Sequence, residues 1–369
     1  NLVREVRTFH LSEHGPATVT EVSEERGLWS DNLRSFVRNS TKDEVAKSLA
    51  TYTEKEYDGT YRSFTSTDAT DVSTPFVVTL EADDVKYSNA DRDEVWAWLS
   101  PYDALAKVPG TFTDNDAEFE RVIKERKVDY LWSVPHVYEV VNRFEVPVGY
   151  VTPELPASET RALGAMTLTT TRGFAAGVYT VTYRLDTGKL QITADQVRAT
   201  RAAVRALGEE ERSQVRFTLE ATRLADQGKV RESIAAIQKL VALHPKEALH
   251  HTQLAVRFQQ LGLGEAALRE TKLAIALEPK NGDAWMVHGH TLARDLTGRI
   301  GSIGNDRPAA LAALRKAIAL SPTHIGARDE LARLLAMDAA GWVSADRAEH
   351  REAVPLLRGL RTEQAADVD

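Results

Sequence analysis

Three helical stretches of the sequence end in the same way, and this repetition most constrains what the chain can fold into. Each stretch is rich in alanine and leucine and closes with leucine, one further residue and proline: LVALHPKEA (240–248), LAIALEPKN (273–281) and KAIALSPTH (316–324). The prolines are 34 and then 43 residues apart. Proline cannot continue a helix, and it biases the residue before it away from helical geometry. Pro245, Pro279 and Pro322 therefore predict a repeated unit whose last helix ends so that the chain can turn into the next pair.

The positions inside the second unit fit two closely packed helices. Small residues stand where the helices must approach, and larger apolar residues fill the space between them. The small residues are Ala255, Gly262, Ala267 and Ala274, and the larger ones are Leu254, Phe258, Leu268 and Leu277. The third unit opens with Trp285, then Gly289, then Leu292. A 34-residue unit with these features resembles the tetratricopeptide repeat, here with His288 in place of a leucine.

This resemblance implies an all-α solenoid of three to four repeats over residues 214–369. The first repeat is expected at 214–247. The fourth is expected from about 325, with Pro355 inside its second helix. The 43-residue spacing is the same unit with nine extra residues, which we place in DLTGRIGSIGND (295–306).

Stacked repeats leave a concave surface that is lined by the first helix of each pair. The groove-facing positions of the repeat, carried over to this sequence, give nine candidate residues for binding a partner. They are Thr252, Gln253, Val256 and Gln260, then Met286, His290 and Arg294, then Asp329 and Arg333. Long polar or adaptable side chains at these positions suit an extended peptide or a helix of a protein partner. The alternative is that the repeats only extend a scaffold or mediate self-association.

Residues 1–192 follow a different pattern, which predicts antiparallel β-strands. Val, Phe, Leu and Thr alternate with charged residues on either side of the His14-Gly15-Pro16 turn. Further alternating runs follow at 75–88, 93–101, 133–147 and 165–192. Alternation gives each sheet one buried and one wet face, which is typical of a β-sandwich or a partly open barrel.

Two segments break this β pattern. The apolar residues of about 28–57 recur at helical spacing, which predicts two short helices inserted in the β-rich module. Ser40 and Thr41 are candidates to cap the second of them. At 193–213 the sequence predicts a helix that connects the module to the solenoid. The expected fold class is therefore α+β and multidomain.

Composition excludes several classes of function. The net charge of −8 lies wholly in residues 1–207, and neither half carries the basic surface of a nucleic-acid-binding protein. No apolar run approaches the roughly 18 residues of a membrane span, so we expect a soluble protein. The chain has no cysteine, which excludes disulfides, thiolate nucleophiles and cysteine-based zinc sites.

No catalytic, metal or cofactor site is predicted. GRIGSIGND (298–306) lacks the Gly-Lys-Ser/Thr ending of a phosphate-binding loop. His288 and His290 point to different sides of a helix, so they cannot bind one metal ion as neighbours. His251 and His288 could meet across adjacent repeats, but no pattern of carboxylates accompanies them to complete a zinc site. The acidic residues Asp83, Asp84, Asp91 and Asp93 match no calcium loop.

A second resemblance covers roughly residues 1–207. The stretches NRFEVPVGYVTPELPASETRALGAMTLTTTRG (142–173) and GVYTVTYRLDTGKLQITADQVRATRAAVRAL (177–207) resemble the β-rich module that follows the transglutaminase-like, papain-type domain of large bacterial envelope proteins. Those proteins often finish with tetratricopeptide repeats. Their chemistry needs a cysteine thiolate with a histidine and an aspartate, so no catalytic residue can be carried over to a chain without cysteine.

Two functions follow as hypotheses. The first is a non-catalytic scaffold in the periplasm or cell envelope, whose repeats bind a protein or peptide partner. The second is the accessory C-terminal part of a transglutaminase-like enzyme whose catalytic domain lies upstream of Asn1. The sequence indicates neither the partner nor the oligomeric state.

Overall fold

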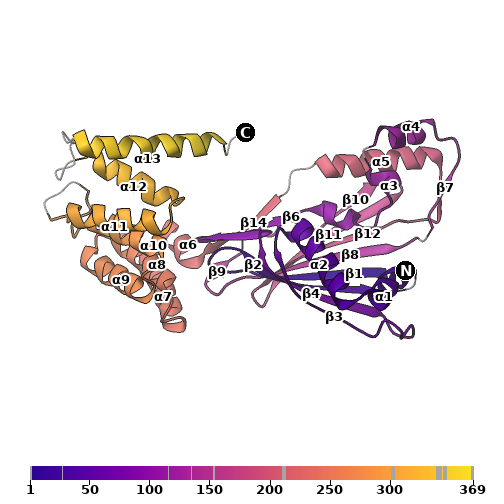
Figure 1. Ribbon diagram of the computed structural model, residues 1–369, viewed down its shortest axis with the longest axis horizontal. Helices are drawn as coiled ribbons and strands as arrows, with labels where there is room; N and C mark the ends of the chain where they lie inside the picture. The colour runs from indigo at the N-terminus through magenta and orange to yellow at the C-terminus, as the bar shows by residue number, and fades with distance from the viewer. Residues whose placement is uncertain are drawn as a thin grey trace. The chain divides into compact units, whose positions relative to one another are not determined.

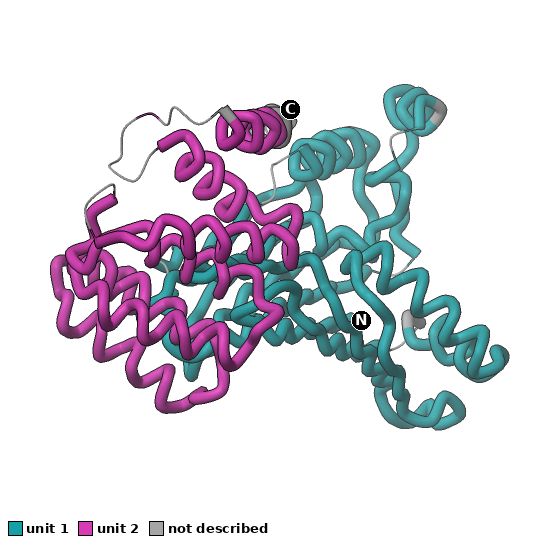
Figure 2. Tube along the Cα trace, turned by 60° about the vertical axis from the view of Figure 1, so that its left-hand side comes forward, with its two compact units in different colours: residues 1–219 teal, residues 220–369 magenta. Residues whose placement is uncertain are grey.

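The computed structural model divides the chain into two compact units, residues 1–219 and residues 220–369 (Figure 1; Figure 2). It describes every residue except 1, 27, 115, 134, 153, 210–212, 301–303, 338–342, 344–346 and 367–369. The division after Leu219 differs from the sequence-based boundaries, which started a connecting helix at 193 and the solenoid at 214. The helix α5 (Ala194–Glu209) and the strand β14 (Ser213–Leu219) both belong to the first unit.

The first unit is built on an eight-stranded sheet with the order β10-β11-β12-β8-β1-β2-β4-β3. The bounds of these strands are Glu159–Leu163, Met166–Ala175, Val178–Asp186, Val137–Glu145, Leu2–His10, Ala17–Glu25, Phe76–Val85 and Thr60–Ser66. Most neighbours are antiparallel, as expected, but β1 pairs with β8 in parallel, with Val3 opposite Tyr138 and Phe9 opposite Phe144. The sheet is therefore mixed, and the expectation of a purely antiparallel module is wrong at its centre.

Smaller sheets complete the first unit. A four-stranded sheet has the order β5-β6-β14-β9, and β13 pairs with β7. Their bounds are Ser88–Asp91, Glu94–Leu99, Ser213–Leu219, Tyr150–Val151, Gln191–Ile192 and Tyr130–Leu131. The two larger sheets meet through Tyr179 of β12 and Phe217 of β14, whose rings contact edge to face at 5.7 Å between centroids.

The predicted helical insertion is present as α1 (Leu28–Asn39) and α2 (Lys42–Tyr57). The hydroxyl of Thr41 accepts a hydrogen bond from the backbone N–H of Glu44, and the Glu44 carboxylate accepts one from the backbone N–H of Thr41. This reciprocal arrangement is a capping box, which satisfies backbone donors that have no partner inside the helix. It fixes the start of α2 at Lys42, with two residues between the end of α1 and this start. The remaining helices of this unit are η1 (Pro101–Leu105), α3 (Gly110–Thr113) and α4 (Ala117–Glu125).

The inner face of the large sheet contains charged residues among apolar ones. Along β1, Val3, Glu5, Arg7 and Phe9 are all buried, whereas Arg4 and His10 on the other face are exposed. Phe9 stacks on Phe144 of the neighbouring strand at 5.0 Å between ring centroids. A buried charge is stable only when it is paired or hydrogen-bonded, so this face needs a dedicated set of partners.

The second unit is helical. It consists of α6 (Glu220–Asp226), α7 (Val230–Leu243), α8 (Ala248–Gln260), α9 (Gly264–Leu277), α10 (Gly282–Leu292), α11 (Arg307–Leu320), α12 (Ile325–Leu335) and α13 (Arg347–Ala366). Pro245, Pro279 and Pro322 each lie two residues after the end of a helix, as their positions predict. The longer third unit has its extra residues between α10 and α11. Residues 301–303 of that connection lie outside the described part of the chain.

Small residues set the distance between the paired helices. Ala255, Ala267 and Ala274 are fully buried, in line with the repeat pattern. A Cβ on Gly289 of α10 would lie 2.8 Å from Cγ of Leu314 in α11, which is closer than real contacts allow. One expectation is not met, because Leu277 is 37% exposed and does not fill the space between its helices.

Candidate partner-binding surface

Polar contacts connect the first helices of three successive pairs in the second unit. The side-chain amide of Gln259 in α8 contacts two residues of α10. Its nitrogen donates a hydrogen bond to the hydroxyl of Thr291 at 2.8 Å, and its oxygen lies 2.8 Å from Nδ1 of His290. Arg294, two residues after the end of α10, lies 3.4 Å from the carboxylate of Glu330 in α12. We call this set the first-helix polar face and define it as Arg257, Gln259, Gln260, His290, Arg294, Glu330 and Arg333.

Glu330 is the centre of the α12 part of this face. It pairs with Arg294 and, within its own helix, with Arg333. Burial alone would raise the pKa of Glu330, but the hydrogen bond from Arg333 and the charges of His290, Arg333 and Arg294 together lower it below its usual range. Burial lowers the pKa of Arg294, although Glu330 opposes that change. The carboxylate is therefore ionised at neutral pH and holds two arginines at one edge of the face.

The α8 part of the face is organised by Arg257. Its guanidinium donates to the side chain of Gln260 at 2.9 Å and to the hydroxyl of Thr222 in α6. Gln260 and Asp329 are exposed, and His290, Arg294 and Arg333 are partly exposed. These five predicted groove residues keep surface available for a partner.

The other four predicted residues take different places. Thr252 and Gln253 are each 1% exposed, and the Thr252 hydroxyl donates to the carbonyl of Leu249 at 2.6 Å. Val256 and Met286 pack against the buried cluster of Ala255, Ala267 and Val287, so they stabilise the contact of α8 with its neighbours. We therefore leave these four out of the surface.

Three members of the polar face were missed by the sequence analysis: Arg257, Gln259 and Glu330. A partial signal exists, because Gln253, Arg257 and Gln260 follow one another at helical spacing. The contacts of Gln259 and Glu330, however, cross from one helix pair to the next. The spacing of residues within one helix does not predict contacts of this kind.

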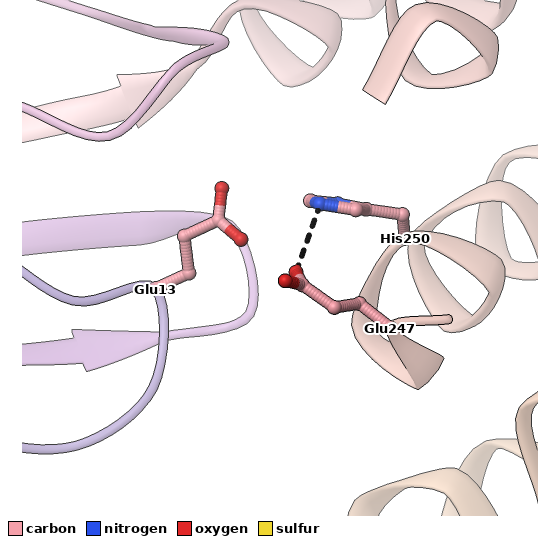
Figure 3. Close-up of side chains that lie close together, drawn as sticks. All are labelled: Glu13, Glu247 and His250. Atoms are coloured by element: carbon pink, nitrogen blue, oxygen red, sulfur yellow. Dashed lines mark ion pairs between the residues drawn. The ribbon is translucent and has the colours of Figure 1, made fainter. Parts of the chain in front are cut away.

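The histidines of this unit have partners of their own. His288 Nδ1 lies 2.8 Å from the Thr271 hydroxyl, and His251 Nδ1 lies 2.7 Å from Glu270. His250 Nε2 lies 3.4 Å from Glu247 (Figure 3). His251 and His288 are thus held by different residues, and within the described part of this unit no three metal-ligating side chains gather at one point.

The helix pairs, their proline-terminated ends and the small residues between them define the second unit as a stack of tetratricopeptide-type repeats. No protein-family model matches the sequence, and no curated protein matches it. None of the helices in the described ranges has the length and apolar character needed to cross a membrane.

Several solved structures are similar to part of the chain. MamA from Desulfovibrio magneticus RS-1, from residue 41 to its end, is 15% identical over 40% of this chain and 72% of its own, with a TM-score of 0.30. A tetratricopeptide repeat protein from Parabacteroides merdae ATCC 43184 is 19% identical over 46% of this chain and 59% of its own, with a TM-score of 0.30. The first such domain of Spaghetti (RPAP3), bound to an HSP90 peptide, is 20% identical over 31% of this chain and 84% of its own, with a TM-score of 0.26.

Proposed function

We propose that the protein is a non-catalytic scaffold whose first-helix polar face binds a protein or peptide partner. The observation that supports this is the run of polar side chains across α8, α10 and α12, with Gln260 exposed and His290, Arg294 and Arg333 partly exposed. Stacked repeats present such faces as extended binding surfaces. Hydrogen-bonding side chains already held in place by their neighbours lose little conformational freedom when a partner arrives.

The proposal is tested by removing exposed groups that do not hold the helices together. The double variant Gln260→Ala/Arg333→Ala removes one side chain from α8 and one from α12 and leaves the Arg294–Glu330 pair intact. Interface side chains of this kind contribute about 1–2 kcal/mol each, so we expect at least a tenfold loss of partner recovery in affinity purification from native lysate.

The matched control is Glu265→Ala/Arg269→Ala on α9, a second helix, where both side chains are at least 70% exposed. We expect this variant to recover the same partners as the unchanged protein. Thermal unfolding of both variants shows whether they are folded. Equal recovery by the two variants would contradict a binding role for the face.

The envelope location and the link to a transglutaminase-like enzyme stay predictions from the resemblance of residues 1–207. The intact mass of the native protein, together with the sequence of any residues before Asn1, tests the enzyme link. A cysteine, histidine and aspartate set in such residues would favour the accessory role over the scaffold.

A further inference from the structure

The first unit has a cavity, open to the surface, between the inner face of the large sheet and the inserted helices. Its volume is about 410 Å³, and it is lined by residues of β1, β2, β4, α1 and α2 together with Lys107. Small-molecule sites in proteins have volumes of roughly 300–1,000 Å³. The cavity is therefore large enough for a small organic molecule. The residues that line it lie between Glu5 and Lys107 in the sequence, well before the repeat helices.

The sheet side of the cavity carries buried carboxylates. Glu5, Glu21 and Glu25 are 6%, 7% and 4% exposed, and all three line the space. Glu5 accepts a hydrogen bond from Arg7 at 2.5 Å, and Glu25 pairs with Lys107 at 3.2 Å. Each of these two carboxylates thus has a cation beside it.

Glu21 is held differently. The hydrogen bonds that it accepts come from hydroxyl groups: from Tyr52 at 2.9 Å, from Tyr57, and from Ser23 at 3.4 Å. Burial, and then the negative charge of Glu5, raise the pKa of Glu21 to about 7, although Arg7 and the two tyrosines oppose the change. A buried carboxylate in this state gains free energy when a positive charge comes close.

Carboxylates outnumber cations on the sheet side of the cavity. Arg7 also faces Glu56 at 2.9 Å and Asp103 at 3.7 Å, so one guanidinium is shared among several acids.

The helix side of the cavity contributes apolar residues, namely Leu33 and Phe36 of α1 and Leu49 of α2, and Val78 of β4 lies among the carboxylates on the sheet side. The three glutamates do not form a group that could hold a metal ion among the described residues. A pocket lined by carboxylates and hydrocarbon side chains instead matches a molecule that is cationic at one end and apolar at the other.

We propose that this cavity binds an organic cation, with its ammonium group beside Glu21 and its apolar body against Leu33, Phe36, Leu49 and Val78. The site goes beyond the scaffold function and does not depend on it.

The test compares ligands that differ in charge alone. Isothermal titration calorimetry of the full chain measures the binding of tryptamine and phenethylamine against their neutral counterparts tryptophol and 2-phenylethanol. We expect each amine to bind at least tenfold more tightly than its alcohol. Equal binding within both pairs, or binding of neither amine, would overturn the proposal.

Two variants connect the binding to the cavity. Glu21→Gln keeps the size of the side chain and its hydrogen bonds but removes the charge, so the amines should bind about tenfold more weakly and the alcohols should not change. Leu49→Trp fills the cavity from the helix side and leaves every carboxylate in place, so it should weaken the binding of all four ligands even if Glu21→Gln does not fold. Glu139→Gln, on the outer face of the same sheet beside Arg4, is the control and should bind like the unchanged protein. If the amines bind both cavity variants as tightly as the unchanged protein, the assignment of the binding site to this cavity is wrong.

Discussion

His288 stands where the repeat pattern has leucine, and its surroundings explain how a polar ring is accepted there. The side chain is 8% exposed and its Nδ1 is hydrogen-bonded to Thr271, a residue of the preceding helix. Burial, with a smaller contribution from the charge of Lys272, lowers the pKa of His288 below 6.5. The folded protein therefore holds this ring in its neutral form.

This neutral histidine gives the stability of the second unit a predictable pH dependence. Because the pKa of His288 is lower in the folded state, the unfolded chain binds more protons below pH 6.5, and stability falls as the pH drops through that value. A single such group contributes up to about 1.4 kcal/mol per pH unit. We expect the free energy of unfolding of His288→Gln, measured in urea, to fall less between pH 7.5 and 5.5 than that of the unchanged protein. His244→Gln, at a half-exposed ring, is the control. An unchanged slope in His288→Gln would contradict a lowered pKa of His288 in the folded protein.

At the scale of elements, the approach of α10 to α11 depends on Gly289. A Cβ there would meet Leu314 at 2.8 Å and the carbonyl oxygen of Ala310 at 3.2 Å. Overpacking of this kind costs roughly 1–3 kcal/mol, whereas replacing a helical glycine by alanine gains only about 1 kcal/mol. We expect Gly289→Ala to lower the free energy of unfolding in urea.

Gly326→Ala in α12 is the matched control for this substitution. The nearest atom to its added Cβ is 3.4 Å away, on His324, which is an ordinary contact. This variant should be as stable as the unchanged protein or slightly more stable. If both alanine substitutions stabilised the protein, the close approach of α10 and α11 would not require a glycine at position 289.

Elements whose signal is local could be predicted from the sequence. The prolines marked the ends of the repeat helices, and Thr41 marked the start of α2 because a cap needs only the residues next to it. The strand β14 was missed, although Val215, Phe217 and Leu219 alternate and are buried. A single short strand between two helices is recognisable only through its pairing with β6, more than a hundred residues earlier.

The candidate sites show the same limit. His290, Arg294 and Arg333 could be predicted because the repeat fixes which helix positions face the groove. The partners Gln259 and Glu330 could not, because their contacts cross between helix pairs. The cavity was also missed. Glu5 and Arg7 lie among charged residues on both sides of β1, and the alternation of this strand does not show which face is inside.

At the scale of the whole molecule, the division after Leu219 makes β14 part of the first fold. Its residues pair with β6 from Ser213 opposite Leu99 to Thr218 opposite Glu94. Phe217 and Leu219 are fully buried, and Val215 is 4% exposed. Burial of three such side chains stabilises by roughly 5–9 kcal/mol, which is comparable to the whole stability of a typical domain at about 5–15 kcal/mol.

We therefore expect a fragment of residues 1–219 to unfold cooperatively in urea, and a fragment of residues 1–212 to have lost that transition. Circular dichroism and intrinsic fluorescence measured on both fragments check this. Coincident midpoints for the two would contradict the assignment of β14 to the first unit. A fragment of residues 220–369 tests whether the repeat stack is folded without β14.

The parallel pairing of β1 with β8 has a consequence for how the protein is made. Arg4 and Glu139 are neighbours across this pair and are 135 residues apart in the chain. At roughly 5–20 residues per second, a ribosome needs on the order of 10 s to deliver the second strand after the first. During that interval the nascent β1–β2 hairpin exposes one open strand edge and the side chains that later become the centre of the sheet. Until β8 has been translated, this open edge can pair with strands of other chains, long before the repeat helices are made.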